Sequence, residues 1–238
     1  MSRDDPVRTT EVTDRIGRVT LDRPKKLNAM NKALLRAVPA AIRDSAEYDV
    51  LIVDGTGESF TAGADLDEAR AESEEAALYQ EMTRATREFE GLVIGALHGW
   101  VIGGGFEWTL SFDLRYAAAD TTFMMTESEV GLPISNASTL YLPLLVGGAR
   151  ARELVYTCRE LPAAEAEDIG LVNGVFDRES LDEEVRAVAA DVVENKSQLA
   201  LRLNKKGFNN AFPVESILEF ETMLGEYANA TPSESIDW

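Results

Sequence analysis

The sequence is poor in the residues that most often form cross-links or bind metals. Cys158 is its only cysteine and His98 its only histidine among 238 residues. A single cysteine cannot form a disulfide within the chain, and one cysteine with one histidine cannot supply the usual ligands of a structural zinc site. We therefore expect neither a disulfide framework nor a bound metal.

Long apolar runs are also missing. The longest apolar stretch covers residues 91–106 and is interrupted by glycines and a histidine, whereas a membrane-spanning helix needs about 20 apolar residues. Residues 1–6 contain neither the basic nor the apolar region of a signal peptide. These features predict a cytoplasmic protein without membrane contact.

Positive charge is scarce as well. The chain has 42 acidic and 23 basic residues, which gives a formal net charge of −19, and only six of the basic residues are lysines. Such a charge repels phosphate backbones, so we expect no nucleic-acid partner. An acidic, lysine-poor surface also fits a protein that works at high salt, where screening removes self-repulsion. A halophilic source is therefore a hypothesis that the salt dependence of stability tests.

The remaining composition, with 45% hydrophobic and 27% charged residues, is that of an ordinary globular protein of one large domain. Strands and helices alternate in the first half of the predicted pattern, and the last third is helical, which indicates an α/β core with a helical appendage. Strands are expected within residues 7–21 (two, with a turn near 14–17), 50–53, 93–97, 114–118, 122–125 and 172–176. Helices are expected at residues 32–46, where Asn31 would be the N-cap, at residues 66–89, and from the glycine turn after the strand at 93–97 to residue 110. Further helices are expected at residues 140–145, 149–157, 163–169, 181–194, 198–211 and 214–229.

Two glycine-containing loops each follow an expected buried strand and precede an expected helix. They cover residues 59–66, Ser-Phe-Thr-Ala-Gly-Ala-Asp-Leu, and residues 98–107, His-Gly-Trp-Val-Ile-Gly-Gly-Gly-Phe-Glu. Glycine lets the backbone approach a ligand, and the first N–H groups of a helix attract negative charge. The loops can therefore converge on one crevice, where two N–H groups would form an oxyanion hole. A tight strand-to-helix crossing without a ligand is the alternative for the second loop, which lacks the spacing of phosphate and dinucleotide loops.

Glu107 and Glu127 are the candidate acid–base residues. Glu107 lies in an otherwise apolar run after the glycines, and Glu127 follows an apolar strand, with Glu129 as its competitor. Any of these side chains could be a surface charge, and Asp65 is most simply a helix N-cap. A Ser–His–carboxylate arrangement would need His98, and no G-x-S-x-G segment is present, so we do not expect a hydrolase of that kind.

Several segments, in order, resemble the crotonase family, also called the enoyl-CoA hydratase/isomerase superfamily. These segments are residues 20–30, 60–66, 98–107, 149–154 and 165–173. The resemblance implies a crotonase-like ββα spiral core over residues 1–190 and a helical C-terminal trimerisation region over residues 191–238. It also implies a homotrimer, or a hexamer built as a dimer of trimers. The implied substrate is an acyl-CoA thioester, with no cofactor other than the coenzyme A of that substrate.

By position, the resemblance assigns roles to individual residues. The oxyanion hole falls on the amides of Ala64 and Gly104. The acid–base pair falls on Glu107 and Glu127, because the spacing of Glu127 before Gly131 fits better than that of Glu129. The residues implied at the CoA site are Lys26, Asn28, Ala29, Ala62, Gly63, Asp65 and Leu66.

Three activities are compatible with this family resemblance. The presence of both glutamates favours hydration of a 2-enoyl-CoA, whereas a Δ3,Δ2-enoyl-CoA isomerase could use Glu127 alone. A CoA-thioester-binding subunit without catalysis is the third possibility, because a fold does not guarantee a chemistry. The sequence also departs from hydratases at residues 131–139, where a Pro-Gly-rich stretch is usual. Removal of Glu107 would discriminate between the first two activities.

Overall fold

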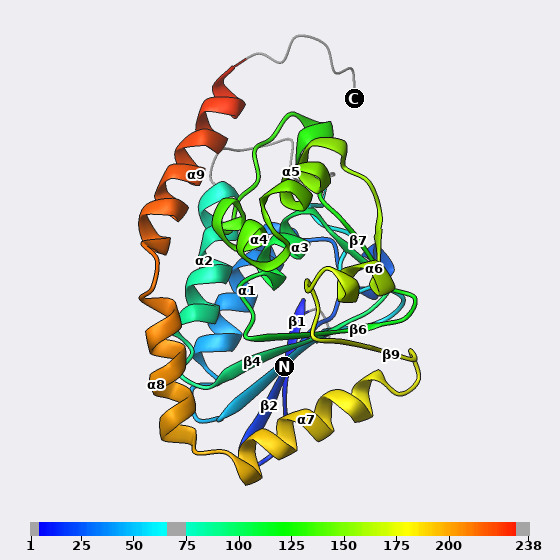
Figure 1. The fold of residues 1–238 in the computed structure, drawn as a ribbon, viewed down its shortest axis with the longest axis vertical. Helices are drawn as coiled ribbons and strands as arrows, with labels where there is room; N and C mark the ends of the chain where they lie inside the picture. The colour runs from blue at the N-terminus through cyan, green and yellow to red at the C-terminus, as the bar shows by residue number, and fades with distance from the viewer. Residues whose placement is uncertain (1–4, 66–74, 232–238) are drawn as a thin grey trace.

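The computed structural model describes residues 5–65 and 75–231 (Figure 1). Its strands are β1 (Val7–Thr13), β2 (Ile16–Leu21), β3 (Val50–Gly55), β4 (Leu92–Leu97), β5 (Trp100–Ile102), β6 (Leu114–Ala118), β7 (Thr122–Met124), β8 (Leu161–Pro162) and β9 (Gly174–Phe176). Its α-helices are α1 (Lys32–Arg43), α2 (Glu75–Glu88), α3 (Gly103–Thr109), α4 (Ser138–Val146), α5 (Gly148–Thr157), α6 (Ala163–Asp168), α7 (Leu181–Asn195), α8 (Gln198–Asn209) and α9 (Val214–Ala230). Two short 3-10 helices are η1 (Pro24–Lys26) and η2 (Glu127–Val130).

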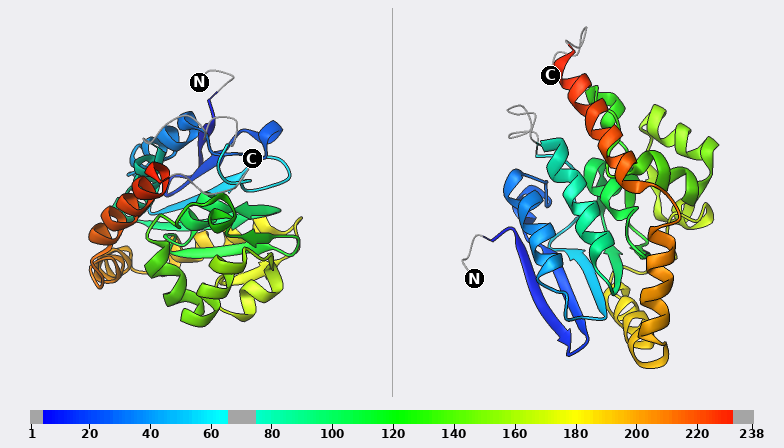
Figure 2. Two further views of the ribbon diagram at one scale, coloured as in Figure 1. Left: turned by 90° about the horizontal axis from the view of Figure 1, so that it is seen from above. Right: turned by 90° about the vertical axis from the view of Figure 1, so that its left-hand side faces the viewer.

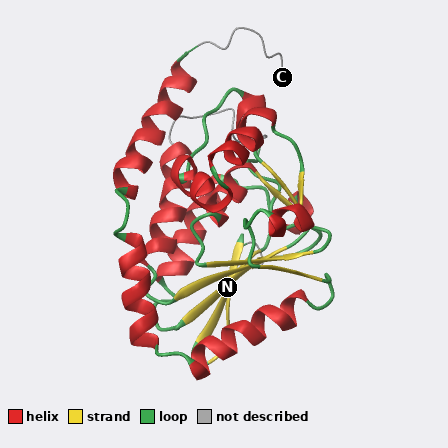
Figure 3. Ribbon diagram, in the orientation of Figure 1, coloured by secondary structure: helices red, strands yellow, loops and turns green. Residues whose placement is uncertain are grey.

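The larger sheet has the strand order β1-β2-β3-β4-β6-β9. Only β1 and β2 pair antiparallel, and the other neighbours are parallel. Alternate residues of β3 point to opposite faces: Leu51 and Val53 join the core beneath α1 and α2, whereas Val50 and Ile52 pack toward α7. Helices therefore cover both faces of the sheet, as Figure 3 shows, and its parallel strands read as continuous apolar runs.

A smaller sheet has the order β5-β7-β8, in which β5 and β7 pair parallel. Each of its first two strands follows closely on a strand of the larger sheet, β5 after β4 and β7 after β6. Isolated parallel bridges between Thr61 and Val101 and between Met30 and Ala64 continue this layer toward the N-terminus. The repeated strand–strand–helix turn confirms the expected ββα spiral, and it brings the loops after β3 and β4 to one end of the larger sheet.

Local sequence signals account for most of the elements. The side chain of Asn31 accepts the Leu34 N–H at 3.0 Å, so the expected cap of α1 is confirmed. Strands β5 and β8 were not expected, because two or three residues are too few to show a period. The helix expected over residues 66–89 is described from Glu75 onward, and its expected start lies outside the described residues.

The C-terminal helices α8 and α9 run one after the other along one side of the molecule (Figure 2). Helix α8 packs on β4, and α9 packs on α2 and α4. The expected boundary between residues 190 and 191 lies inside α7, so a division there would cut a continuous helix that covers the sheet. Among the described helices, none is long and apolar enough to cross a membrane.

Candidate active site

The two glycine loops lie side by side. The Thr61 N–H donates to the Trp100 carbonyl at 3.0 Å, and the Ile102 N–H donates to the Thr61 carbonyl at 3.1 Å. A Cβ atom at Gly63, where φ is +82°, would lie 3.0 Å from the Ile102 carbonyl oxygen. Glycine thus permits both the turn and the close approach at this position. The expected convergence of the two loops is confirmed.

The amides expected to form the oxyanion hole, those of Ala64 and Gly104, lie in the two adjacent loops. Met30 donates its N–H to Gly63 at 2.7 Å and accepts the Asp65 N–H at 3.1 Å. This parallel bridge flanks Ala64, so the Ala64 N–H points away from Met30. Gly104 is the second residue of α3, and the N–H groups of a first turn have no acceptor within their own helix.

Glu107 lies in α3 and is almost completely buried. The Ser135 N–H donates to Glu107 Oε1 at 2.8 Å, the Ser135 hydroxyl donates to Oε2, and the Asn136 side-chain amide donates to Oε2 at 3.4 Å. Burial raises the pKa of Glu107 well above its usual range, and the charge of Glu127 raises it further. The hydrogen bonds from Ser135 act in the opposite direction and favour the charged form.

Glu127 begins η2 and lies against the glycines of the second loop. A Cβ atom at Gly103 would be 3.1 Å from Glu127 Oε1, so only glycine leaves this space open. Glu127 Oε2 is buried without a hydrogen-bond partner among the described residues. Burial raises the pKa of Glu127 to about 7. Glu129 is exposed, so the structure brings Glu127, and not its competitor, to Glu107.

The segments expected at the CoA site are also brought together. The Ala62 N–H donates to the Leu27 carbonyl at 2.9 Å, which places residues 26–30 beside residues 61–65. Lys26 is exposed, whereas Ala29 is buried. The described parts of the two expected CoA segments are therefore adjacent in the structure.

Two side chains of this surface are engaged within the protein. Asn28 is fully buried, and its amide group donates to the carbonyls of Thr56 and Ser59, both at 2.9 Å. The Asp65 carboxylate accepts from the Arg23 guanidinium at 3.0 Å. These side chains hold the loops in place. Leu66, the remaining expected residue, lies outside the described residues.

Sequence reasoning missed three residues that lie beside Glu107 or Gly104. Ser135 and Asn136 bind Glu107, and the ring of Tyr79 in α2 would lie 2.4 Å from a Cβ atom at Gly104. The departure from a Pro-Gly-rich stretch at residues 131–139 was the only signal for the first two. Tyr79 gave no signal, because a single aromatic residue on a helix is most often part of the core.

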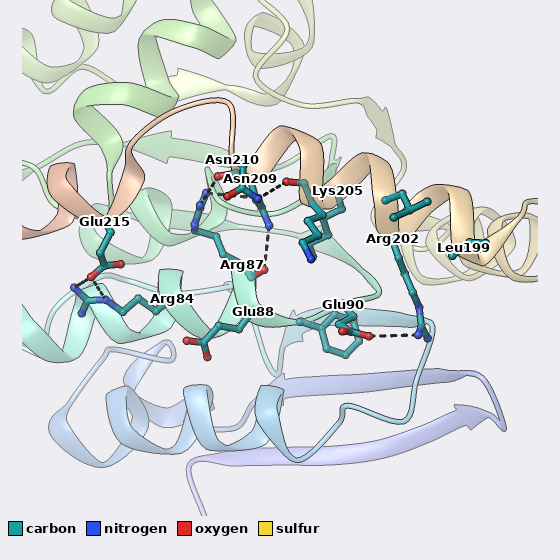
Figure 4. A pocket seen from close by; sticks show the side chains of 13 residues that line it. Arg84, Arg87, Glu88, Glu90, Leu199, Arg202, Lys205, Asn209, Asn210 and Glu215 are labelled. Carbon is teal, nitrogen blue, oxygen red and sulfur yellow. Dashed lines mark hydrogen bonds and ion pairs between the residues drawn. The ribbon is translucent and has the colours of Figure 1, made fainter.

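A separate groove of about 620 Å³ lies between the C-terminal end of α2 and α8 (Figure 4). Two of its arginines bind acidic groups of the protein itself: Arg84 binds Glu215, and Arg202 binds Glu90. Lys205 is buried and donates to Asp113 at 2.8 Å. The contacts of Arg202 and Lys205 fasten α8 to the body of the protein, and the Arg84–Glu215 pair joins α2 to α9. Neither candidate glutamate lines the groove.

Comparison with known proteins shows the family to which the chain belongs. The sequence pattern of the enoyl-CoA hydratase/isomerase family matches residues 11–234, so the chain belongs to this family of enzymes. A crotonyl-CoA hydratase from Syntrophomonas wolfei is 35% identical over 214 residues, covering 86% of this chain and 82% of the relative. The human mitochondrial Delta(3,5)-Delta(2,4)-dienoyl-CoA isomerase is 32% identical over 220 residues, covering 84% and 67%.

Solved structures agree on the fold. An enoyl-CoA hydratase from Mycobacterium avium subsp. paratuberculosis has a TM-score of 0.90 at 24% identity, with 98% of this chain and 97% of that chain covered. An enoyl-CoA hydratase/isomerase from Pseudoalteromonas atlantica has a TM-score of 0.87 at 28% identity, with 95% and 92% covered. The expected crotonase fold is confirmed.

Proposed function

We propose that the protein is an enoyl-CoA hydratase, which adds water across the C2–C3 double bond of a 2-enoyl-CoA thioester. The observation that carries the proposal is the pair of buried carboxyl groups, Glu107 and Glu127, beside the amides of Ala64 and Gly104. The identity of 35% to a crotonyl-CoA hydratase supports the same reaction.

The two amides stabilise the charge that develops on the substrate. When water attacks C3, the double bond shifts and negative charge moves onto the thioester oxygen as an enolate. The N–H groups of Ala64 and Gly104 donate to that oxygen. Preorganised donors of this kind are effective because they need no reorientation during the reaction, and loss of one costs about 3–4 kcal/mol.

The two glutamates move the protons. Because both carboxyl groups are buried and interact, the pair holds one proton between them near neutral pH. We assign the shared proton to Glu127 in the reacting state, because hydrogen bonds from Ser135 favour the charge on Glu107. Burial and the charge of Glu127 act against this assignment and raise the pKa of Glu107 well above its usual range. Glu107 then takes a proton from the attacking water, its hydroxide adds to C3, and Glu127 delivers its proton to C2.

The CoA portion of the substrate lies along residues 26–30 and 62–66. The adjacency of the described parts of these segments supports this assignment. The exposed Lys26 offers a cation to the phosphate groups of CoA, whereas Asn28 and Asp65 shape the surface through their internal hydrogen bonds. Coenzyme A enters only as part of the substrate, and the reaction needs no further cofactor.

The direct test follows the absorbance of the conjugated enoyl thioester of crotonyl-CoA with purified protein. A hydratase lowers this absorbance, and Glu107→Gln and Glu127→Gln each abolish the loss. A Δ3,Δ2-enoyl-CoA isomerase, the alternative activity, instead raises the absorbance when 3-enoyl-CoA is offered. Tight binding of CoA esters without turnover of any would identify a binding subunit.

We also propose a homotrimer or a dimer of trimers, in which the helices after α7 form the contacts between subunits. Exposed apolar side chains on these helices support this assembly, because monomeric surfaces rarely gather so many. They are Leu199, Leu203, Phe208, Phe220, Met223 and Tyr227. Light scattering tests the proposal, which requires a mass three or six times the 26.1 kDa of the chain.

A further inference from the structure

We propose that Ser135 is a positioning residue for Glu107, and that its hydroxyl group holds the carboxylate in the orientation that accepts a proton from water. This inference rests on the proposed hydratase function and adds to it a residue outside the four groups assigned above.

The geometry of the contact is specific. Ser135 donates from its backbone N–H to Glu107 Oε1 at 2.8 Å and from its hydroxyl to Glu107 Oε2. One residue therefore binds both oxygens and fixes the plane of the carboxylate. The Asn136 side-chain amide donates to the Ser135 hydroxyl oxygen at 3.2 Å. Because the hydroxyl oxygen accepts from Asn136, its own proton is directed toward Glu107.

The segment that carries Ser135 is clamped by α2. Asn136 and Ala137 both adopt left-handed backbone angles, with φ of +58° and +59°, which non-glycine residues keep only where their surroundings impose them. The Asn136 N–H donates to Gln80 at 3.0 Å, and the Thr83 hydroxyl donates to the Asn136 side chain at 2.9 Å. These contacts fix the residue that follows Ser135.

Helix α9 clamps the same segment from the other end. The carboxylate of Glu221 is buried and accepts the Ala137 N–H at 2.7 Å and the Thr139 N–H at 3.0 Å. The position of the Ser135 hydroxyl is thus set by two helices, and not by a loose surface loop.

The Ser135 hydroxyl matters because the surroundings of Glu107 otherwise disfavour a negative charge on its carboxyl group. Burial, the charge of Glu127 at η2 and the charge of Glu221 from α9 all raise the pKa of Glu107. The hydrogen bonds from Ser135 are what lowers it. Loss of the hydroxyl should therefore raise the pKa of Glu107 and leave less of it charged near neutral pH.

The test compares Ser135→Ala, Ser135→Thr and a matched control, Ser138→Ala. The Ser138 hydroxyl is also buried in this segment but has no hydrogen-bond partner in the described part of the chain. The kcat and kcat/KM for crotonyl-CoA are measured against pH. Ser135→Ala should lower kcat about tenfold at neutral pH with little change in KM, and should move the acidic limb of kcat/KM up by about one pH unit.

Two further results support the inference. Ser135→Thr, which keeps a hydroxyl, should retain most of the activity, and Ser138→Ala should keep the pH profile of the unmodified protein. Carbon NMR of protein labelled at its glutamate carboxyl groups gives a readout that needs no turnover. The Glu107 signal, identified by its absence in Glu107→Gln, should titrate at higher pH in Ser135→Ala, and thermal unfolding confirms that each variant folds.

An equal loss of kcat at every pH in Ser135→Ala, with an unchanged titration of Glu107, would overturn the inference, because it would show a purely structural role. Failure of the hydratase proposal has a different signature. In that case the unmodified protein leaves crotonyl-CoA unchanged, while the Glu107 signal still shifts in Ser135→Ala.

Discussion

Both oxygens of Glu107 accept hydrogen bonds from residues 135 and 136, whereas one oxygen of Glu127 has no partner among the described residues. The two carboxyl groups are buried in one site, yet their surroundings differ in the donors they supply. Donors favour a charged carboxylate, and their absence in a buried place favours a protonated one. The contrast in donors is the feature on which the proposed division of roles rests, with Glu107 as the base and Glu127 as the acid.

The largest expected effect comes from removing either carboxyl group. Glu107→Gln and Glu127→Gln should each lower kcat for crotonyl-CoA by about 10²–10⁴-fold, with smaller changes in KM, because each loses one proton transfer in the transition state. Steady-state kinetics on crotonyl-CoA checks both. If Glu107→Gln kept most of the activity toward a 3-enoyl-CoA, the reaction would be the isomerisation and the contrast would have no catalytic meaning.

The burial of Glu127 predicts a dependence of folding stability on pH. Its pKa of about 7 in the folded protein exceeds the ordinary value of a glutamate, so the folded state binds the proton more tightly than the unfolded state. This contribution is present below the ordinary pKa and is lost as pH rises through about 7, a loss of the order of 3 kcal/mol. Chemical denaturation at several pH values checks it, and Glu127→Gln should remove that part of the slope.

Weakening the contacts that hold residues 135–139 should have the next largest effect, a loss of folding stability. Glu221→Gln turns one acceptor oxygen into a donor that faces the N–H groups of Ala137 or Thr139. A buried mismatch of this kind costs about 1–3 kcal/mol. Denaturation midpoints check this, and Glu219→Gln, an exposed neighbour on the same helix, is the matched control. Equal stability of the two variants would contradict the clamp.

Added salt should have the smallest effect of these changes, and it should act on the exposed carboxylates and not on the buried pair of glutamates. A net charge of −19 predicts that added salt stabilises the folded protein by screening repulsion between exposed carboxylates. Buried groups are screened much less, so the acidic limb of the hydration profile should stay in place. Unfolding in low and high salt checks the first expectation, and indifference to salt would argue against a halophilic source.

The sequence predicted the elements whose signals are local. Strand β6 was expected at the residues where it occurs, and the cap of α1 was expected at Asn31. The pairing of the two glycine loops followed from their like positions after parallel strands. Glu107 and Glu127 were chosen by resemblance to a family, because a glutamate in a sequence is far more often a surface charge.

The residues that the sequence could not predict act over long separations. Ser135 and Glu221 act on Glu107 from parts of the chain that only the folded spiral brings together. Asn136 and Ala137 adopt left-handed backbone angles, but neither is a glycine, the residue that would have indicated such angles in the sequence. The boundary expected after residue 190 lies within α7, which contacts the larger sheet and leads into α8.

The contact between Glu221 and the start of α4 has a consequence for synthesis of the protein. Chains emerge from the ribosome with the N-terminus first, and early regions fold before later ones exist. Until α9 has been made, the N–H groups of Ala137 and Thr139 lack the acceptor that Glu221 provides. The segment that holds Ser135 therefore gains its last contacts only at the end of synthesis.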